Sequence, residues 1–370
     1  MVRRLFALAI LFIAGVATAH GSTLIAPDNP AIVYSPYNWS VSHAAAISPN
    51  PGAYFRTMFT GRTAVLQFDA ATMAGPASEI WWRVDDRTWT KTAVAGAIAL
   101  AIPADALGNP DIPYHTLEVV FKSMDIVANR WNSTGFWTAL KLAGIALDDG
   151  AMVKAPAVLP CNLLIYGDSI TEGVRTMGES AVMATDQNDA QQGWAYLLGE
   201  TLGCEVGVVG FGGQAFTTST IGNVPAAPLS YDLIYQGRPR SFSPAPTLVI
   251  SNEGFNDRSS PGDSVTAAAT AFFKGLLAAT PPSTRVVQLE PLPAITPPGT
   301  SAAIRTAVTG IASPRLSWVS TAGIFNTAYG ADSLLVHPSG ANDQSLIAPQ
   351  LAALLAPYLR PVRRPGAAQR

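Results

Sequence analysis

One serine of this 370-residue chain stands where a nucleophile could be presented to a substrate. Residues 163–173 are LLIYGDSITEG, so an apolar run ends in Gly-Asp-Ser, with Ser169 just past its end. Gly, Asp and Ser are ordinary turn residues, and the stretch could simply close a buried strand. Alternatively, the strand aims the Ser169 hydroxyl at a site. A serine hydroxyl is a weak nucleophile until a base takes its proton, so this second interpretation requires a base elsewhere in the chain.

The chain has four histidines, and only one of them shares a half of the sequence with Ser169. His43 and His115 lie in the first half, and His20 lies at the cleavage point predicted below. His337 stands in DSLLVHPSGAND, after the last predicted strand and before the last predicted helix. A single histidine is more often structural, but elimination leaves His337 as the candidate base.

Attack on a carbonyl also needs N–H donors for the oxyanion that develops. Two loops could supply them. GFGGQAF (210–216) has glycines that let backbone N–H groups approach a substrate closely, and SNEGFND (251–257) offers the side-chain amide of Asn256. GFGGQA also fits the dinucleotide pattern G-x-G-x-x-A, but the TTSTIGNVPAAP that follows cannot open a helix on a pyrophosphate.

The segments that must position these residues alternate between strand-like and helix-like patterns from residue 161 onward. This alternation predicts an α/β domain with a parallel sheet covered on both faces, in three layers. In such sheets ligands bind outside the carboxyl ends of the strands, where Ser169, both donor loops and His337 all fall. The predicted strands are 163–166, 206–209, 248–250, 286–289 and 316–319, and helical spacing marks 194–202, 265–276 and 346–355.

The first half shows the two-residue period of β-strands instead, as in Ile80, Trp82 and Val84, and again over 117–121. We expect an all-β, jelly-roll-like sandwich over 20–150. A linker over 151–160, the α/β domain over 161–359 and a disordered tail over 360–370 follow. Six tryptophans of this half are expected in its core, with a sugar-binding face as the alternative: Trp39, Trp81, Trp82, Trp89, Trp131 and Trp137.

Residues 1–19 have the three parts of a secretory signal peptide. Arg3 and Arg4 precede the apolar run 5–16, and Ala17-Thr18-Ala19 gives the small-x-small cleavage pattern. A membrane anchor is the alternative, but the run is short and no stop-transfer charges follow. We therefore expect export to a periplasm or the cell exterior, with no membrane association after cleavage. A formal net charge of −2 gives no case for a nucleic-acid partner.

The two cysteines each precede an apolar run, Cys161 before 163–166 and Cys204 before 206–209. If these runs are neighbouring parallel strands, both cysteines lie at one sheet edge within disulfide reach. We favour the bridge, as a staple remote from the chemistry, over two free buried thiols. Two cysteines and scattered histidines suggest no metal site.

Taken together, the four segments resemble the SGNH (GDSL-type) hydrolases over roughly residues 160–358. GDSITEG resembles the first block of that family, GFGGQ the second, GFND the third and HPSG the fifth. The resemblance implies Ser169 as nucleophile and His337 as base, with Asp168 and Gly254 in supporting positions. It implies an oxyanion hole formed by the N–H of Ser169, the N–H of Gly213 (Gly212 is the second choice) and Asn256. No cofactor is needed.

One departure from the family pattern concerns the group that orients the histidine. The family usually has an aspartate three residues before it, and here that position is Leu334. Asp332, five residues before His337, could reach around a longer turn and complete a triad. Alternatively, a backbone carbonyl orients the ring and leaves a Ser–His dyad.

A β half followed by an SGNH half resembles the two-domain carbohydrate esterases that deacetylate xylan and related polysaccharides. This resemblance implies a secreted esterase in which Ser169 takes an acetyl group from a sugar and passes it to water, with an acylated carbohydrate as partner. The alternatives are a polysaccharide O-acetyltransferase, a lipase or thioesterase, and an inactive carbohydrate-binding protein.

Overall fold

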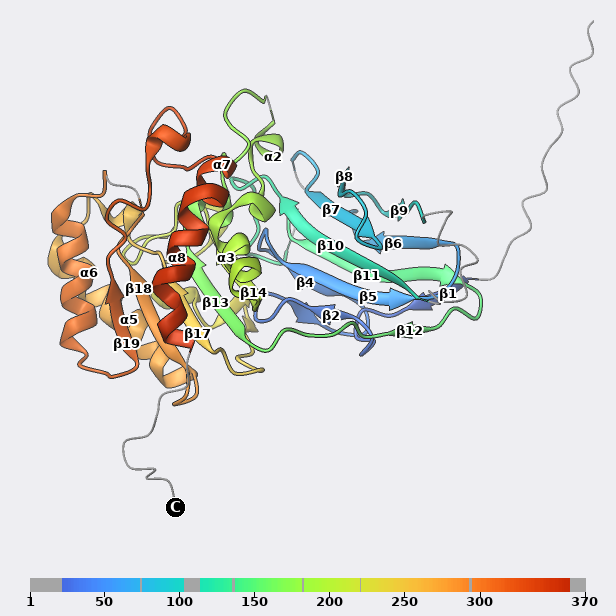
Figure 1. Ribbon diagram of the computed structural model, residues 1–370, viewed down its shortest axis with the longest axis horizontal. Helices are drawn as coiled ribbons and strands as arrows, with labels where there is room; N and C mark the ends of the chain where they lie inside the picture. The colour runs from blue at the N-terminus through green and yellow to red at the C-terminus, as the bar shows by residue number, and fades with distance from the viewer. Residues whose placement is uncertain are drawn as a thin grey trace, which may run out of the picture.

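The computed structural model describes residues 22–73, 75–102, 114–134, 137–181, 183–219, 221–292 and 295–359. The predicted signal peptide, residues 1–19, and the predicted tail, residues 360–370, lie outside these residues. An all-β half and an α/β half follow one another along the long axis of the molecule (Figure 1). Within the described ranges, no helix is both long and apolar enough to cross a membrane.

Two antiparallel sheets build the first half. One has the order β3-β4-β11-β6-β9, with β1 also paired to β11, and the other has the order β12-β5-β10-β7-β8, with β2 paired to β5. The strands of the first sheet are β1 (Ser22–Ile25), β3 (Ser40–Val41), β4 (Ala46–Ser48), β6 (Ala64–Phe68), β9 (Ala97–Ala99) and β11 (Leu140–Asp148). Those of the second are β2 (Val33–Tyr34), β5 (Tyr54–Phe59), β7 (Glu79–Val84), β8 (Thr90–Ala93), β10 (His115–Ser123) and β12 (Val153–Lys154).

Alternate residues of these strands fill the space between the two sheets. Ile80, Trp82 and Val84 of β7 point into this core together with every second residue of β10, as their alternation predicts. Of the six tryptophans, Trp81 and Trp89 are half-buried and the other four are buried, which fits core positions rather than an exposed sugar-binding face. The segment predicted as a linker differs from expectation, because Val153–Lys154 pairs with β5 and so belongs to the second sheet.

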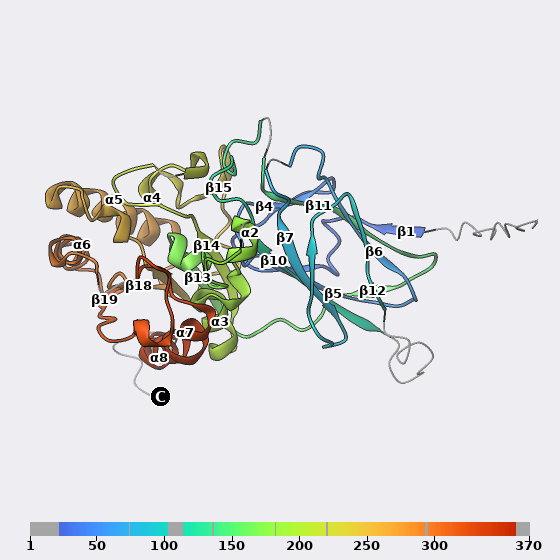
Figure 2. The same cartoon turned by 90° about the horizontal axis from the view of Figure 1, so that it is seen from above.

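A five-stranded parallel sheet of order β14-β13-β17-β18-β19 lies at the centre of the second half. Helices α5 (Gly262–Ala279) and α6 (Pro298–Gly310) cover one face, and α3 (Trp194–Leu202) and α8 (Ala348–Leu355) cover the other (Figure 2). This is the predicted three-layer arrangement, with a π-helical turn at Asp343–Ile347 before α8. The strands are β13 (Asn162–Gly167), β14 (Glu205–Gly210), β17 (Leu248–Ser251), β18 (Arg285–Leu289) and β19 (Leu316–Val319).

The remaining elements of this half are short. Four α-helical turns are α1 (Ser169–Glu172), α2 (Ala184–Gln187), α4 (Ala227–Ser230) and α7 (Gly340–Asn342), and β15 (Leu233–Tyr235) pairs with β16 (Arg238–Pro239). Single 3₁₀ turns cover Ala190–Gln192, Ile221–Asn223, Phe255–Asp257, Thr327–Tyr329 and Ala356–Leu359.

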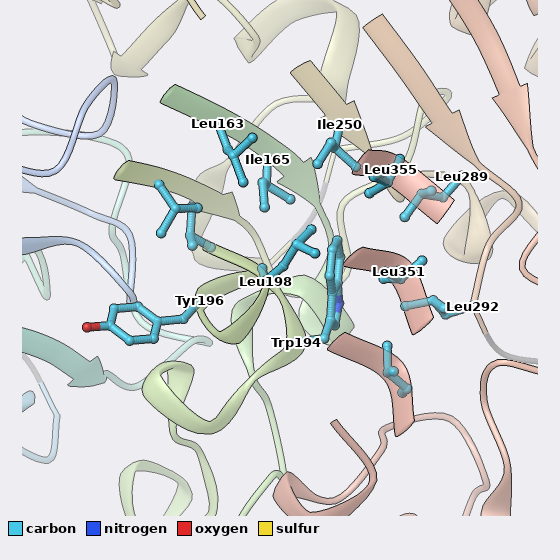
Figure 3. Packing of buried hydrophobic residues seen from close by; sticks show 14 of the residues in the cluster. Leu163, Ile165, Trp194, Tyr196, Leu198, Ile250, Leu289, Leu292, Leu351 and Leu355 are labelled. Atoms are coloured by element: carbon cyan, nitrogen blue, oxygen red, sulfur yellow. The ribbon is translucent and has the colours of Figure 1, made fainter. Parts of the chain in front are cut away.

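Residues 163–165 of β13 are consecutive apolar residues, as expected for a strand that is covered on both faces. Leu163 and Ile165 pack with Trp194, Leu198, Leu351 and Leu355 of the α3–α8 layer (Figure 3). Leu164 and Tyr166 point to the opposite face, into the cluster formed with α5 and α6. Each fully buried leucine contributes about 2 kcal/mol of hydrophobic free energy, so the run that carries Ser169 is held firmly in the core.

The sheet order brings the predicted site loops together. Strand β13 lies between β14 and β17. The chain passes from β13 to β14 on one side of it, and then from β14 to β17 on its other side. Such a switch point opens a crevice at the carboxyl ends of the strands. The loops after β13, β14 and β17 are the ones that hold Ser169, Gly213 and Asn256.

The β half covers the free edge of β14. Strand β14 is the first of the five, so one side of its backbone has no strand beside it. On that side the Asn38 amide donates to Val208 O (3.2 Å), the Asn50 amide donates to Gly210 O (3.4 Å), and Val206 N donates to the Tyr54 hydroxyl (3.3 Å). The contact is close, because a Cβ on Gly207 would stand 2.0 Å from Pro36 O. Side chains of one domain therefore complete the edge of the other.

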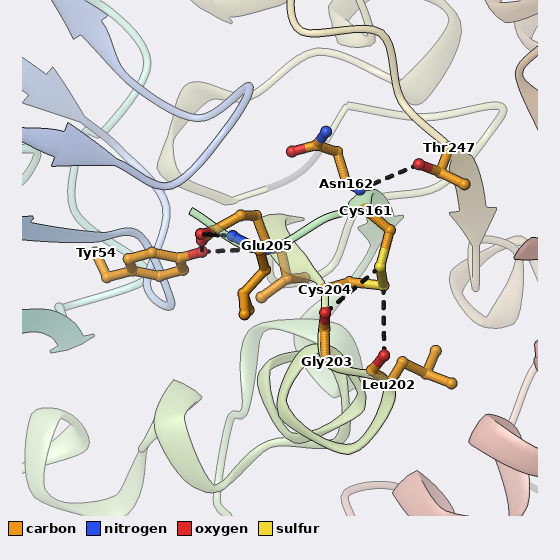
Figure 4. Close-up of a disulfide and its surroundings, with 10 residues drawn as sticks. Tyr54, Cys161, Asn162, Leu202, Gly203, Cys204, Glu205 and Thr247 are labelled. Atoms are coloured by element: carbon orange, nitrogen blue, oxygen red, sulfur yellow. Dashed lines mark hydrogen bonds between the residues drawn. A yellow bond between two sulfur atoms is a disulfide. The ribbon is translucent and has the colours of Figure 1, made fainter. Parts of the chain in front are cut away.

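The two cysteines form a disulfide at the amino edge of the sheet (Figure 4). Strands β13 and β14 are parallel neighbours, paired from Asn162–Glu205 to Gly167–Gly210. Cys161 and Cys204 directly precede them, and their Cα atoms are 4.7 Å apart. The bridge is thus at the opposite end of both strands from Ser169.

Replacement of both cysteines by serine should lower the free energy of unfolding by about 2–4 kcal/mol, because the bridge closes a loop with a sequence separation of 43. A urea titration of the wild type and the double variant measures this difference. The kcat/KM for an ester should stay unchanged, since the strands are held by their own pairing and the site is at the far edge. A folded double variant with strongly reduced kcat/KM would contradict the claim that the disulfide stabilises the fold without affecting the site.

Candidate active site

Ser169 occupies the first position of helix α1, directly after β13. The preceding residue, Asp168, caps the helix by accepting a hydrogen bond from Ile170 N at Oδ1 (3.0 Å). Ser169 is half-buried while Asp168 is buried. The strand-to-helix turn therefore points the hydroxyl outward and keeps the supporting carboxyl inside.

Ser169, His337 and Asp332 form a continuous hydrogen-bonded line. Ser169 Oγ lies 2.8 Å from His337 Nε2, and His337 Nδ1 lies 2.7 Å from Asp332 Oδ2. This is the nucleophile, base and orienting acid geometry of a catalytic triad. The structure thus places Asp332, and not a backbone carbonyl, against the second nitrogen of the ring.

Asp332 reaches His337 because the intervening residues form a tight hairpin. Asp332 N donates to His337 O (2.9 Å), and Asp332 Oδ1 accepts from Val336 N (2.8 Å) and His337 N (3.1 Å). Leu335 turns the chain with φ +56, and Leu334 is 63% exposed. The position where the family usually has its aspartate therefore points to solvent, and the hairpin brings Asp332 into place from five residues away.

The electrostatic environment keeps Asp332 ionised and His337 neutral. Burial alone would raise the pKa of Asp332, but hydrogen bonds from His337, from the backbone and from Arg175 outweigh it and hold the pKa at about 2. Burial lowers the pKa of His337 below its ordinary 6.5, although the bond to Asp332 acts in the opposite direction. A neutral imidazole with its Nδ1–H on a carboxylate can accept the Ser169 proton at Nε2.

Arg175 is a second partner of the same carboxylate, and the sequence gives no sign of it. Arg175 Nη1 donates to Asp332 Oδ2 (2.8 Å) and also contacts Glu179 Oε1 (2.8 Å). Glu179 in turn accepts from Ser333 N (2.8 Å). One ion pair, Arg175–Asp332, and one hydrogen bond, from Ser333 N to Glu179, therefore join the loop after α1 to the hairpin of His337. The positive charge of Arg175 also lowers the pKa of His337, after the larger effect of burial.

Two of the backbone N–H groups predicted to form the oxyanion hole have no acceptor within the part of the protein that the structure describes. Among the described residues, neither Ser169 N nor Gly213 N has a hydrogen-bond acceptor. Gly212, the second choice from sequence, is buried, and its N–H donates to Glu172 Oε2 (2.7 Å). Gly213 is half-buried and has φ +77, a left-handed conformation that favours glycine. The geometry therefore favours Gly213 over Gly212 as an oxyanion donor.

Asn256 lies beside these donors, but both of its amide protons are engaged. Asn256 Nδ2 donates to Gln214 O (2.9 Å) and to Asp168 Oδ2 (3.1 Å). It can reach an oxyanion only by sharing or exchanging one of these bonds. Gly254 makes the preceding turn possible, with φ +126 and a Cβ position only 2.3 Å from Ile304 Cδ1.

Asp168 connects the start of α1 to Asn256, because its Oδ1 accepts from Ile170 N and its Oδ2 accepts from the Asn256 amide. It is fully buried, and burial raises its pKa to about 7, although the bond from Ile170 N acts against the shift. The nearby charges of Glu172 and Asp257 add to the rise. Asp168 is thus a supporting residue beneath the site and does not touch solvent.

The comparisons with known proteins agree with this geometry. Residues 165–342 match the GDSL-like Lipase/Acylhydrolase family. A family two carbohydrate esterase from Cellvibrio japonicus superposes with a TM-score of 0.74 at 19% identity, covering 92% of this chain and 98% of that one. An acetyl xylan esterase from the rumen bacterium Butyrivibrio proteoclasticus gives 0.71 at 13% identity, covering 91% and 98%.

A third solved structure, a family two carbohydrate esterase from Clostridium thermocellum in complex with cellohexaose, gives a TM-score of 0.68 at 17% identity, covering 89% of this chain and 99% of that one. No curated protein matches the sequence significantly. At these identities the superpositions show a shared fold, and they include both the β half and the α/β half.

A three-layer α/β fold with a hydroxyl, an imidazole and a carboxylate in line at the carboxyl edge of its sheet defines a hydrolase of the SGNH class. The α/β domain belongs to the GDSL-like lipase/acylhydrolase family, and the chain is a carboxylic ester hydrolase. The matched segment contains Ser169, Gly213, Asn256 and His337.

Removal of the Arg175 charge should move the acid limb of the kcat/KM profile to higher pH. That limb reports the pKa of the free His337, which must be neutral to act as base. In the wild type its midpoint should lie below the ordinary 6.5, and Arg175→Met should raise it because a positive charge no longer opposes the imidazolium. Initial rates with an activated acetate ester between acidic and neutral pH measure the shift.

Arg175→Lys is the matched control, since it keeps the charge and shortens only the hydrogen-bonding reach. Its acid limb should stay near that of the wild type. An unchanged limb in Arg175→Met, or an equal shift in both variants, would contradict the electrostatic role.

Proposed function

We propose that this protein is a serine esterase that removes acetyl groups from a carbohydrate through an acyl-enzyme. The observation that carries the proposal is the Ser169–His337–Asp332 line beside the two free N–H groups of Ser169 and Gly213. His337 Nε2 takes the proton of Ser169 while Oγ bonds to the ester carbonyl carbon. The carbonyl oxygen becomes an oxyanion and accepts hydrogen bonds from the two backbone N–H groups.

The tetrahedral intermediate collapses when the bond to the sugar oxygen breaks and His337 returns its proton to that oxygen. The sugar leaves as an alcohol, and the acetyl group stays on Ser169. A water molecule then loses a proton to His337 and attacks the acetyl carbon. When this second intermediate collapses, acetate leaves and Ser169 recovers its proton. Asp332 stabilises the imidazolium in both halves of the reaction.

The carbohydrate part of the proposal is supported by architecture. The superposed proteins share both halves of this chain, and they are two carbohydrate esterases and an acetyl xylan esterase. The site itself is open: Ser169, Gly213, Asn256 and His337 are each half-buried. An open site at a sheet edge fits an ester on a bulky polymer better than a long acyl chain, which needs a deep apolar channel.

Secretion belongs to the same proposal. The signal-like sequence of residues 1–19 directs export. The Cys161–Cys204 disulfide supports an oxidising compartment, where such bridges persist.

Ser169→Ala should abolish hydrolysis of p-nitrophenyl acetate, with a loss in kcat of about 10⁴-fold or more. Ser320→Ala is the matched control, because Ser320 directly follows β19 as an exposed residue at the same edge of the sheet, three strands away. It should keep the activity of the wild type. Substantial turnover by a folded Ser169→Ala enzyme would remove Ser169 as the nucleophile.

Acyl-chain preference tests the substrate class. With p-nitrophenyl esters, kcat/KM should be at least about tenfold higher for the acetate than for the octanoate, because an open site gains little from added methylenes. Acetate release from acetylated xylan should also be detectable and should disappear in Ser169→Ala. A rise of kcat/KM with chain length would favour a lipase instead. Transfer of acetyl to an added sugar in preference to water would favour the transferase.

A further inference from the structure

An arginine of the β half reaches into the active-site half of the molecule. Arg130 lies in the segment between β10 and β11, and its side chain is fully buried. Nη1 donates to Glu172 Oε1, and Nη2 donates to Glu172 Oε2 at 3.1 Å. A bidentate guanidinium–carboxylate pair fixes the orientation of both groups, and not only their separation.

Glu172 links this pair to the segment after β14 that contains Gly212 and Gly213, called the oxyanion loop below. It is the last residue of α1, three positions after Ser169, and its side chain is 2% exposed. Its Oε2 accepts the N–H of Gly212 at 2.7 Å. The next residue, Gly213, carries an N–H that has no acceptor among the described residues. A chain of three hydrogen-bonded groups therefore runs from the β half to the residue before an oxyanion donor.

Arg130 holds the same loop at two further points. Its guanidinium lies 5.0 Å from the centre of the Phe211 ring, and its backbone N–H donates to Gly222 O (3.2 Å). From the same β segment, Ile126 Cδ1 lies 3.2 Å from the position that a Cβ on Gly212 would occupy. The segment after β14 is thus contacted from the β half at Phe211, Gly212 and Gly222.

We propose that Arg130 is a positioning residue for ester hydrolysis, acting through Glu172 on the oxyanion loop. Without it, Glu172 would be an uncompensated buried carboxylate one helical turn from Ser169, and such a charge opposes a developing oxyanion. With it, the carboxylate is neutralised and oriented, and it anchors the peptide before Gly213. The β half is therefore required for the chemical step and not only for holding substrate.

The same interface offers a matched control. Arg56 is also an arginine of the β half, and it pairs with Glu205, a buried glutamate of β14 (Figure 4 shows the Glu205 end). Glu205 begins β14, whereas the oxyanion loop follows its last residue, Gly210. Six residues of strand separate the two ends by about 17 Å. Loss of either arginine breaks one interdomain ion pair, but only Arg130 touches the oxyanion loop.

The test compares Arg130→Met and Arg56→Met in the full chain. With p-nitrophenyl acetate, Arg130→Met should lower kcat by about 10- to 100-fold. This loss is smaller than the one expected when a direct oxyanion donor is removed. KM should change less than about threefold. The rate of Ser169 phosphorylation by diethyl p-nitrophenyl phosphate should fall in parallel, since that reaction uses the same oxyanion hole. Arg56→Met should keep kcat and the phosphorylation rate within about threefold of the wild type, even if its melting temperature falls as much as that of Arg130→Met.

Equal kcat losses in the two variants, or a change in KM alone, would overturn the proposal. If Arg130→Met does not fold, Arg130→Lys is measured in its place. Its kcat should still fall, because one ammonium group cannot reproduce the bidentate contact with both oxygens of Glu172. Full activity of Arg130→Lys would overturn the positioning role of Arg130. The inference rests on Ser169 as nucleophile. The wild type and Ser169→Ala are therefore measured alongside. If Ser169 is not the nucleophile, Ser169→Ala will keep its esterase activity, whatever the result for the Arg130 variants.

Discussion

The free edge of β14 is the constraint on which the rest of this structure depends. An open strand edge exposes backbone groups that need partners, and here Asn38, Asn50 and Tyr54 of the β half supply them. The same strand is tied to β13 by a disulfide before its first residue and runs into the oxyanion loop after its last. The contacts of the β half with β14 therefore help to set the position of the oxyanion loop relative to Ser169.

The Ser169–His337–Asp332 line shows how a longer loop can bring an acid to the histidine. The hairpin between Asp332 and His337 replaces a shorter turn, and its own backbone N–H groups hold the carboxylate that orients the imidazole. Arg175 adds a cation to that carboxylate and connects the hairpin to the loop after α1. Because burial and Arg175 both act against protonation of His337, the ring stays available as a base.

Local signals predicted much of the fold and the core of the site. Apolar runs bounded by turns located the five parallel strands, and the residues after them included Ser169 and His337. The role of Asp332 was left open, because it depends on the left-handed turn at Leu335. The contacts of Arg130 with Glu172 and of Arg175 with Asp332 carry no local signal, since these partners lie 42 and 157 residues away. The sequence predicted Asn256 as an oxyanion donor, but it could not show that both of its amide protons are engaged within the protein.

The most direct test of the account is the location of the acyl group on the enzyme. The wild type is mixed with p-nitrophenyl acetate, quenched in acid during turnover, digested and analysed by peptide mass spectrometry. The account predicts the mass of one acetyl group on the peptide containing Ser169, localised to that residue by fragmentation and absent from Ser169→Ala. Turnover with the acetyl group on another residue would contradict it.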